Sequence, residues 1–111
     1  MRSKKGTYKI ATNEGWVEKE GSFCHCFPFV IHRESHQRQW TISHMATGYQ
    51  VIKEIARFKD AKRAVDKLKP FSVFLMPDLE TWNKALLRLQ NNKPKEYTEL
   101  ISIISQQWIK R

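Results

Sequence analysis

The sequence predicts an α+β fold, in which an antiparallel sheet of about four strands from the N-terminal half is covered by about three helices from the C-terminal half. Three observations lead to this prediction. Apolar and polar residues alternate in several segments before residue 56, which is the period of half-buried strands. From Asp60 onward, apolar residues recur every three or four positions, as in amphipathic helices. Strands first and helices later favour segregated layers over a parallel sheet.

The predicted strands are short segments of alternating residues separated by turn residues. Asn13-Glu14-Gly15 and Thr47-Gly48 are the clearest turns, and Glu34–Gln39 is polar throughout and is expected to be an exposed loop. The predicted strands are Thr7–Thr12, Trp16–Glu20, Ser22–Arg33, Trp40–Met45 and Tyr49–Ile55.

The segment Ser22–Arg33 shows the strictest alternation in the chain and is predicted to be one strand. Phe23, Phe27, Phe29 and Ile31 would form its strongly apolar inner face. Pro28 cannot donate a hydrogen bond to a neighbouring strand, so it is expected at an edge, a bulge or a break.

Three helices are predicted in the second half of the chain. The first, Asp60–Lys69, ends at Pro70, which cannot continue a helix. The second runs from Leu79 to about Leu89 after Asp78, a favourable N-cap residue. The third begins at Pro94, since proline is tolerated in the first turn. Between the first two, Phe71–Met76 is short and apolar, which favours a buried strand and leaves a connecting segment as the alternative.

The length of 111 residues is near the common size of one domain. We expect residues 1–6 to be a basic flexible tail and residues 7–111 to form a single α+β domain. No apolar run of about eighteen residues predicts a membrane span. The basic start is not followed by the apolar segment of a secretory signal, so the expected location is cytoplasmic. Ile103 and Trp108 lie where the last helix leaves room for a homodimer contact.

The two cysteines form the motif Cys24-His25-Cys26. Residues two apart on a strand face the same side, so a disulfide between these two would be strained, which agrees with a reducing compartment. Together with His32 on the same predicted face and His44 across from it, they are the candidate ligands for a metal. A CxC pair on a flat strand lacks the curvature of a CxxC knuckle. We therefore favour buried core cysteines and predict no metal and no cofactor.

A catalytic function is not predicted. The glycines are isolated, so there is no phosphate-cradling loop, and no segment resembles a nucleophile motif. The acidic residues lie mostly among Lys and Arg, as solvated or paired charges do. We expect a protein that is not an enzyme, with no catalytic residues.

The charge of the chain is strongly positive and unevenly distributed. The formal net charge is +9, and residues 1–70 carry 14 Lys and Arg against 7 Asp and Glu, whereas residues 71–111 carry 6 against 4. Such a chain attracts phosphate backbones and disfavours acidic surfaces, so the leading expected partner is nucleic acid, DNA or RNA. A solvated surface that only keeps the protein soluble remains the alternative.

The candidate binding residues fall into two groups. The polar loop and its flanks contain Arg33, Gln37, Arg38 and Gln39, and Arg and Gln are suited to reading base edges. Three aromatic residues could stack on unpaired bases if they face outward: Trp16, Trp40 and Tyr49. The predicted phosphate contacts are Arg33, Arg38, Lys53, Arg57, Lys59, Lys62, Arg63, Lys67 and Lys69.

The strand–turn–strand–helix segment Trp40–Lys69, with its Ala61-x-x-Ala64 helix, resembles the small sheet-and-helix DNA-binding modules of phage and transposon integrases. The resemblance covers about thirty residues and implies a sheet that lies in the major groove. A small basic chain also suits a regulator from a phage or mobile element. The rival expectation is a protein-binding module, a small inhibitor or adaptor that docks on a larger enzyme or complex through an aromatic and Arg patch.

Overall fold

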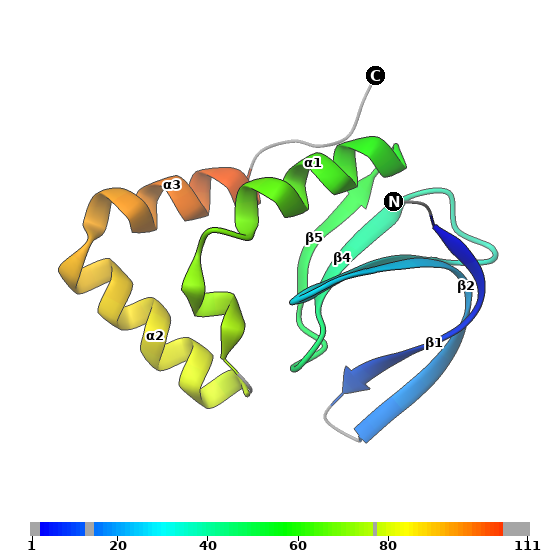
Figure 1. Cartoon of the computed structure of the whole chain (residues 1–111), viewed down its shortest axis with the longest axis horizontal. Helices are drawn as coiled ribbons and strands as arrows, with labels where there is room; N and C mark the ends of the chain where they lie inside the picture. The colour runs from blue at the N-terminus through cyan, green and yellow to red at the C-terminus, as the bar shows by residue number, and fades with distance from the viewer. Residues whose placement is uncertain (1–2, 13–14, 77, 106–111) are drawn as a thin grey trace.

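The computed structural model describes residues 3–12, 15–76 and 78–105 (Figure 1). In these residues the chain forms a five-stranded antiparallel sheet with the order β1-β2-β3-β4-β5, followed by helices, which confirms the α+β prediction. The elements are β1 (Lys4–Thr12), β2 (Gly15–Cys26), β3 (Phe29–Glu34), β4 (Trp40–His44), β5 (Gln50–Ile55), α1 (Phe58–Leu68), the 3-10 turn η1 (Ser72–Leu75), α2 (Leu79–Asn92) and α3 (Pro94–Ser105).

The segment Ser22–Arg33 is a hairpin of β2 and β3 rather than one strand. The chain reverses at Phe27 and Pro28, so that Cys26 pairs directly with Phe29. Residues that pair across an antiparallel ladder face the same side of the sheet. The two-residue turn therefore shifts the inward-facing positions from even numbers in β2 to odd numbers in β3.

This reversal corrects the predicted apolar face. Cys24 pairs with Ile31, and both face the helices together with Phe29. Phe23 pairs with His32, and both face the opposite side of the sheet. The predictions that Phe23 shares a face with Phe29, and that His32 shares one with Cys24, are therefore wrong. The prediction that Phe27 belongs to the inner face is also wrong, because Phe27 lies in the turn and is exposed.

The long β1–β2 hairpin curls over the sheet, as Figure 1 shows. Strand β1 begins at Lys4, so residues 4–6, which we predicted to be part of a flexible tail, are paired with β2. Gly6 pairs with Gly21 at the bend. A Cβ on Gly21 would lie 2.1 Å from the carbonyl oxygen of Arg33, so a glycine is needed for this close approach of β2 to β3.

The curl buries a second, partly polar cluster on the face away from the helices. The ring of Tyr8 lies 5.4 Å from that of Phe23 and 5.2 Å from that of His32, and Val30 is buried beside them. The Nε2 atom of His32 is hydrogen-bonded to the Ser43 hydroxyl at 2.7 Å. Burial disfavours the charged form of each side chain. It therefore raises the pKa of Tyr8 to about 12 and lowers that of His32 to about 4. We call Tyr8, Phe23, Val30, His32 and Ser43 the hairpin-side cluster.

Strand β5 departs from regular pairing with β4 at two points. Val51 is an extra residue between Gln50 and Ile52 at the first, and Glu54 adopts a positive φ of 62° at the second. Such bulges re-aim the side chains that follow them. As a result, Ile55 is fully buried against the helices immediately before α1 begins.

The helices cover the other face of the sheet. Helix α1 packs on β3, β4 and β5, α3 contacts α1 and β5, and α2 contacts η1 and α3. Trp82 of α2 is buried against Phe74 of η1 and stacks on His44 of β4, with ring centroids 5.6 Å apart. Figure 1 shows α2 and α3 meeting at a corner and diverging from it.

Two predictions about this layer need correction. The segment Phe71–Met76 is not a strand, because adjacent residues Val73 and Phe74 are both buried, which a 3-10 turn allows and an alternating strand does not. On α3, Ile103 is buried in the core, whereas Ile101 is exposed. Ile103 therefore offers no dimer contact, and Trp108 lies outside the described residues.

The three predicted helices are present, and the starts of α2 and α3 follow the expected signals. The Asp78 carboxylate accepts a hydrogen bond of 2.8 Å from the backbone N–H of Thr81, as an N-cap does. Helix α3 begins at Pro94. Helix α1 begins at Phe58, two residues earlier than predicted.

Candidate functional site

Helix α1 carries the highest density of positive charge in the structure's helical layer. Residues 57–69 contain six Lys and Arg and two Asp. The apolar residues of α1 recur with the helical period and are buried against the sheet, which leaves most of the charged residues on the outer surface. Its buried apolar residues are Ala61, Ala64, Val65 and Leu68.

Asp60 holds two arginines in place at the start of α1. Its side chain is only 1% exposed, whereas those of Arg57 and Arg63 are exposed by more than half. The carboxylate lies 3.4 Å from Nε of Arg57 and 3.5 Å from Nη1 of Arg63. A buried carboxylate needs such partners, because an unpaired charge in the interior is costly. Two outward-facing guanidinium groups share one negative charge, so the group keeps a net positive charge.

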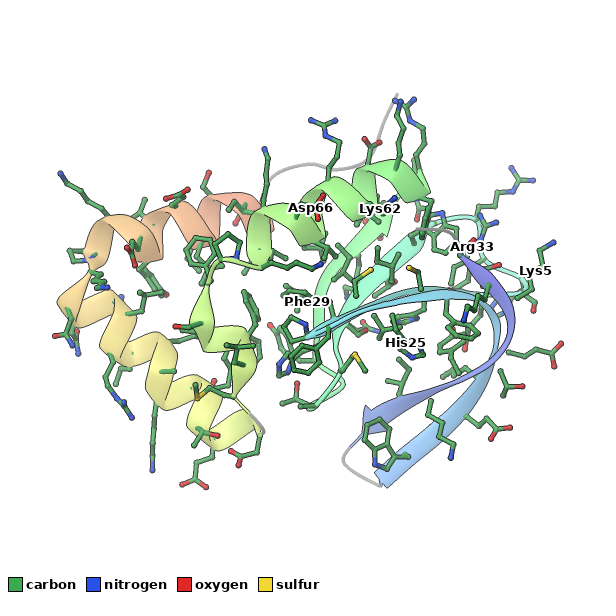
Figure 2. All side chains as sticks on the ribbon, in the orientation of Figure 1. Lys5, His25, Phe29, Arg33, Lys62 and Asp66 are labelled. Atoms are coloured by element: carbon green, nitrogen blue, oxygen red, sulfur yellow. The ribbon has the colours of Figure 1, made fainter. Side chains whose placement is uncertain are left out.

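The lysines of this segment surround the two arginines. Lys59, Lys67 and Lys69 are exposed and Lys62 is half-buried, while the exposed Asp66 lies among them. Figure 2 shows Lys62 and Asp66 on neighbouring turns of α1. The outer surface of α1 is therefore predominantly positive. We call Arg57, Lys59, Lys62, Arg63, Lys67 and Lys69 the α1 basic surface.

Arg33 extends this positive surface beyond the start of α1. Its guanidinium lies over the ring of Trp40, 4.4 Å from the centroid, and its Nη1 donates a hydrogen bond to the carbonyl of Arg38. Trp40 in turn packs on Phe58, the first residue of α1, with ring centroids 4.8 Å apart. These contacts connect the β3–β4 loop to the N-terminal end of α1.

Trp40 itself cannot stack on a base. Its side chain is 4% exposed, because Arg33 and Phe58 cover it. Our prediction of Trp40 as a stacking residue is therefore wrong. The Gln37 side-chain oxygen accepts a hydrogen bond from the backbone N–H of Glu34, so this side chain helps to shape the loop. Gln39 is exposed in the loop.

An open depression of about 560 Å³ lies beside Arg33. It is bounded by β1, the middle of β2, the end of β3 and the β3–β4 loop. Figure 2 shows Lys5 and Arg33 close together at the right of the molecule, beyond the N-terminal end of α1. We call it the loop depression; its lining residues are Lys5, Gly6, Thr7, Glu20, Gly21, Ser22, Arg33, Glu34, Ser35, Gln37 and Arg38.

Sequence reasoning missed Lys5, because residues 1–6 were expected to form a tail. A signal existed, since alternation through Lys5, Thr7 and Lys9 continues the strand pattern toward the N-terminus.

A second depression of about 580 Å³ lies on the other side of the same loop. Arg38 and Gln37 line both depressions, and Lys53 and Gln39 line only this one. The predicted residue Lys53 is thus near the loop, but it belongs to β5, not to the α1 basic surface.

The four candidate metal ligands do not form a site. Cys24 and Cys26 are buried with Sγ atoms 3.5 Å apart and no disulfide between them, and His32 lies on the opposite face of the sheet. Both ring nitrogens of His44 are engaged: Nε2 donates to the carbonyl of Phe74, and Nδ1 accepts from the Thr47 hydroxyl. Within the described ranges, no group of three or more His, Cys, Asp or Glu residues could hold a metal ion.

The Cys26 thiol is also poorly suited to nucleophilic chemistry. Burial, with the neighbouring Cys24 adding to it, raises the pKa of Cys26 to about 11, so the reactive thiolate is disfavoured at neutral pH.

The other predicted stacking residues lie away from α1. Tyr49 is 51% exposed on the β4–β5 turn, where its ring contacts Trp82 edge-on. Trp16 is 63% exposed near the tip of the β1–β2 hairpin. The structure therefore brings together Arg33, Arg38 and the α1 basic surface, and leaves these two aromatic side chains outside it.

Comparison with known protein families, with curated proteins and with solved structures finds no match to this chain. Among the helices that the structure describes, none has the length and apolar character needed to cross a membrane.

Proposed function

We propose that this protein binds nucleic acid through phosphate contacts, without catalysing a reaction. The observation that carries the proposal is the α1 basic surface, on which a helix anchored by four buried apolar residues carries four cations, and its two cap residues add two more. Each Lys or Arg that neutralises a phosphate releases condensed counterions, which makes such binding favourable and strongly dependent on salt. Eleven helical residues span about 16 Å, enough to follow several phosphates.

The mode of contact we propose differs from the one that the integrase-type modules imply. Those modules lay an open sheet in the major groove. Here Val30, His32 and Ser43, on the face away from the helices, are buried under the curled hairpin. The proposed contact surface is therefore the outside of α1 together with the β3–β4 loop.

The experiment that tests the proposal measures binding to duplex DNA, single-stranded DNA and RNA across a salt series. The variant Lys59→Gln/Lys67→Gln/Lys69→Gln removes three exposed charges from α1 without touching the Asp60 ion pairs. We expect the slope of log K against log salt to fall by about 3, and the affinity at 0.1 M salt to fall by about a hundredfold.

The matched control is Arg88→Gln/Lys93→Gln/Lys95→Gln, which removes the same charge from exposed positions of α2 and α3. This variant should bind nearly as well as the original protein. Equal losses in the two variants would mean that only the net charge matters, and no binding to any nucleic acid at low salt would remove the proposal.

The second candidate function is docking on another protein. The observation in its favour is a pair of exposed aromatic residues at one end of the sheet: Phe27 is 71% exposed and Tyr49 is 51% exposed. Their two turns are joined by a hydrogen bond of 2.9 Å from the Met45 N–H to the Pro28 carbonyl. Exposed aromatic side chains are frequent anchors of interfaces. A stoichiometric complex that survives high salt and is lost in Phe27→Ser/Tyr49→Ser would favour this function.

We propose a cytoplasmic location and an origin in a phage or mobile element as the setting for this function. The two unbridged thiols agree with a reducing compartment. The small, basic, single-domain chain suits a regulator of such elements.

A further inference from the structure

The loop depression combines cations, hydroxyl groups and exposed backbone in one concave surface. Its volume of about 560 Å³ falls within the range of pockets that hold small organic ligands. Thr7, Ser22 and Ser35 are among its lining residues, and the Ser35 hydroxyl donates a hydrogen bond to the Glu20 carbonyl. Gly6 and Gly21 contribute no side chain, so the floor at the bend of the hairpin is backbone.

Arg33 is the most rigidly held cation of this lining. One side of its guanidinium lies against the indole of Trp40, and Nη1 donates to the Arg38 carbonyl. Trp40 is itself fixed between Arg33 and Phe58. A planar guanidinium held in this way offers its remaining surface to the depression, where a nucleobase can stack on it.

The charge balance of the depression favours an anionic ligand. Lys5, Arg33 and Arg38 line it together with two carboxylates, Glu20 and Glu34. Glu34 is neutralised by Lys19, whose Nζ lies 2.8 Å away and holds the pKa of this carboxyl below its usual range. The three cations therefore outweigh the exposed Glu20, and this carboxylate remains available to accept hydrogen bonds from hydroxyl or amino groups.

We infer that the loop depression binds one unpaired nucleotide of the nucleic acid whose backbone follows α1. Lys5 and Arg38 contact its phosphate, and its base stacks on Arg33. This inference rests on the proposed function and adds a preference to it, since a paired base inside a duplex cannot leave the stack to enter the depression without the cost of unpairing. The protein should therefore prefer strands with an unpaired segment.

The test compares a blunt duplex with the same duplex carrying a three-nucleotide single-stranded overhang, both as DNA and as RNA. The variant Arg33→Met keeps an apolar stem over Trp40 but removes the guanidinium. We expect Arg33→Met to weaken binding of the overhang duplex by about tenfold, the order of one lost stacking contact. Binding of the blunt duplex, in which Arg33 can contact only a phosphate, should weaken less, so the preference for the overhang duplex should fall. A 2-aminopurine in the overhang should lose fluorescence on binding to the original protein and not to the variant.

A second variant, Lys5→Gln/Arg38→Gln, removes the phosphate contacts while leaving Arg33 on Trp40. It should weaken binding of the overhang duplex and lower its salt slope by about 2. Lys53→Gln, on the other side of the loop, is the control and should leave the preference for the overhang intact. Thermal unfolding checks that each variant is folded.

Equal affinity of the original protein for blunt and overhang duplexes would overturn the inference, as would an Arg33→Met variant that keeps the overhang preference. Either result, combined with a loss of binding in the α1 variant, leaves the proposed function standing. If no nucleic acid binds at all, both fall together.

Discussion

The two faces of the sheet are buried in different ways. The helix side is a mainly apolar core, in which Phe29, Ile42 and Leu68 are fully buried. It also encloses the hydrogen-bonded His44 and the ion-paired Asp60. The hairpin side buries Tyr8 and His32, and burial favours the neutral form of both side chains. His32 is hydrogen-bonded to Ser43 there. Apolar burial does not depend on pH, whereas burial of titratable groups does. We therefore expect the helix side to supply most of the free energy of unfolding, and the hairpin side to make that free energy depend on pH.

The largest expected effect tests the helix side. Phe29→Ala should lower the free energy of unfolding by about 3–5 kcal/mol, because it removes a fully buried ring that packs edge-on against Phe74. Urea unfolding monitored by tryptophan fluorescence measures the change. Phe27→Ala is the matched control, since Phe27 is two residues away and exposed, and it should change stability by less than about 0.5 kcal/mol. Similar losses in both variants would contradict an apolar core on this side.

The next effect tests how the hairpin side closes. Gly21→Ala should cost about 3 kcal/mol, because its Cβ would overlap the backbone carbonyl of Arg33 and force β2 away from β3. Gly15→Ala is the comparison: its Cβ meets nothing within 4 Å, so its cost comes from the positive φ alone, about 1 kcal/mol. Thermal unfolding of both variants separates the two causes, and equal costs would show that the close approach is unimportant.

The third effect is the pH dependence of the hairpin side. The pKa of His32 is about 4 in the folded protein, against about 6.5 for an unperturbed histidine. As pH falls below 6.5, the unfolded chain gains a proton that the folded protein does not accept, so stability declines between pH 6.5 and 4. The full loss from this residue is about 3 kcal/mol.

Urea unfolding at a series of pH values checks this prediction, with His32→Gln as the variant without a titrating group. The variant should be less stable at pH 7 but should show a flatter profile between pH 6.5 and 5. The carboxyl of Glu34, whose pKa is lowered by Lys19, contributes at more acidic pH and does not obscure this window. An unchanged slope in the variant would assign the acid sensitivity to another group.

The smallest effect concerns the N-terminal cap of α2, which lies in the helical layer. Asp78→Ala should cost about 1 kcal/mol through the lost cap of α2, while Asp78→Asn should cost little, since asparagine is an equally good N-cap. Neither variant should change the pH profile between 6.5 and 5, because α2 packs on η1, on α3 and, through Trp82, on His44, all on the helix side of the sheet. A change in that profile would mean that the two faces are coupled.

Local patterns sufficed for much of the fold. The helical period predicted α1 within two residues of its start. The Asp78 cap and the start of α3 at Pro94 also follow from local chemistry alone. These features depend only on residues within four positions in the chain, so a single sequence is enough to predict them.

The failures concern contacts between distant segments. The alternation of Ser22–Arg33 does not reveal the reversal at Phe27 and Pro28, because odd and even positions of this segment both carry apolar residues. Phe23 and Phe29 fit one face of a straight strand, whereas in the hairpin the inward positions change from even to odd numbers across the turn. The stacking of Arg33 on Trp40 follows from that reversal, and Lys5 reaches the loop depression only because the β1–β2 hairpin curls. The α1 half of the candidate site was therefore predictable, and the depression was not.

The open edges of the sheet have a consequence for self-association. Edge strands invite further strands to add to the ladder, and proteins resist this with bulges and lysines. Strand β5 has two irregularities in its pairing, and β1 carries the exposed residues Lys4, Lys5 and Lys9. We therefore expect the lysines at this edge to oppose the addition of a strand from a second copy. Neutralising them should make such strand addition at β1 more favourable.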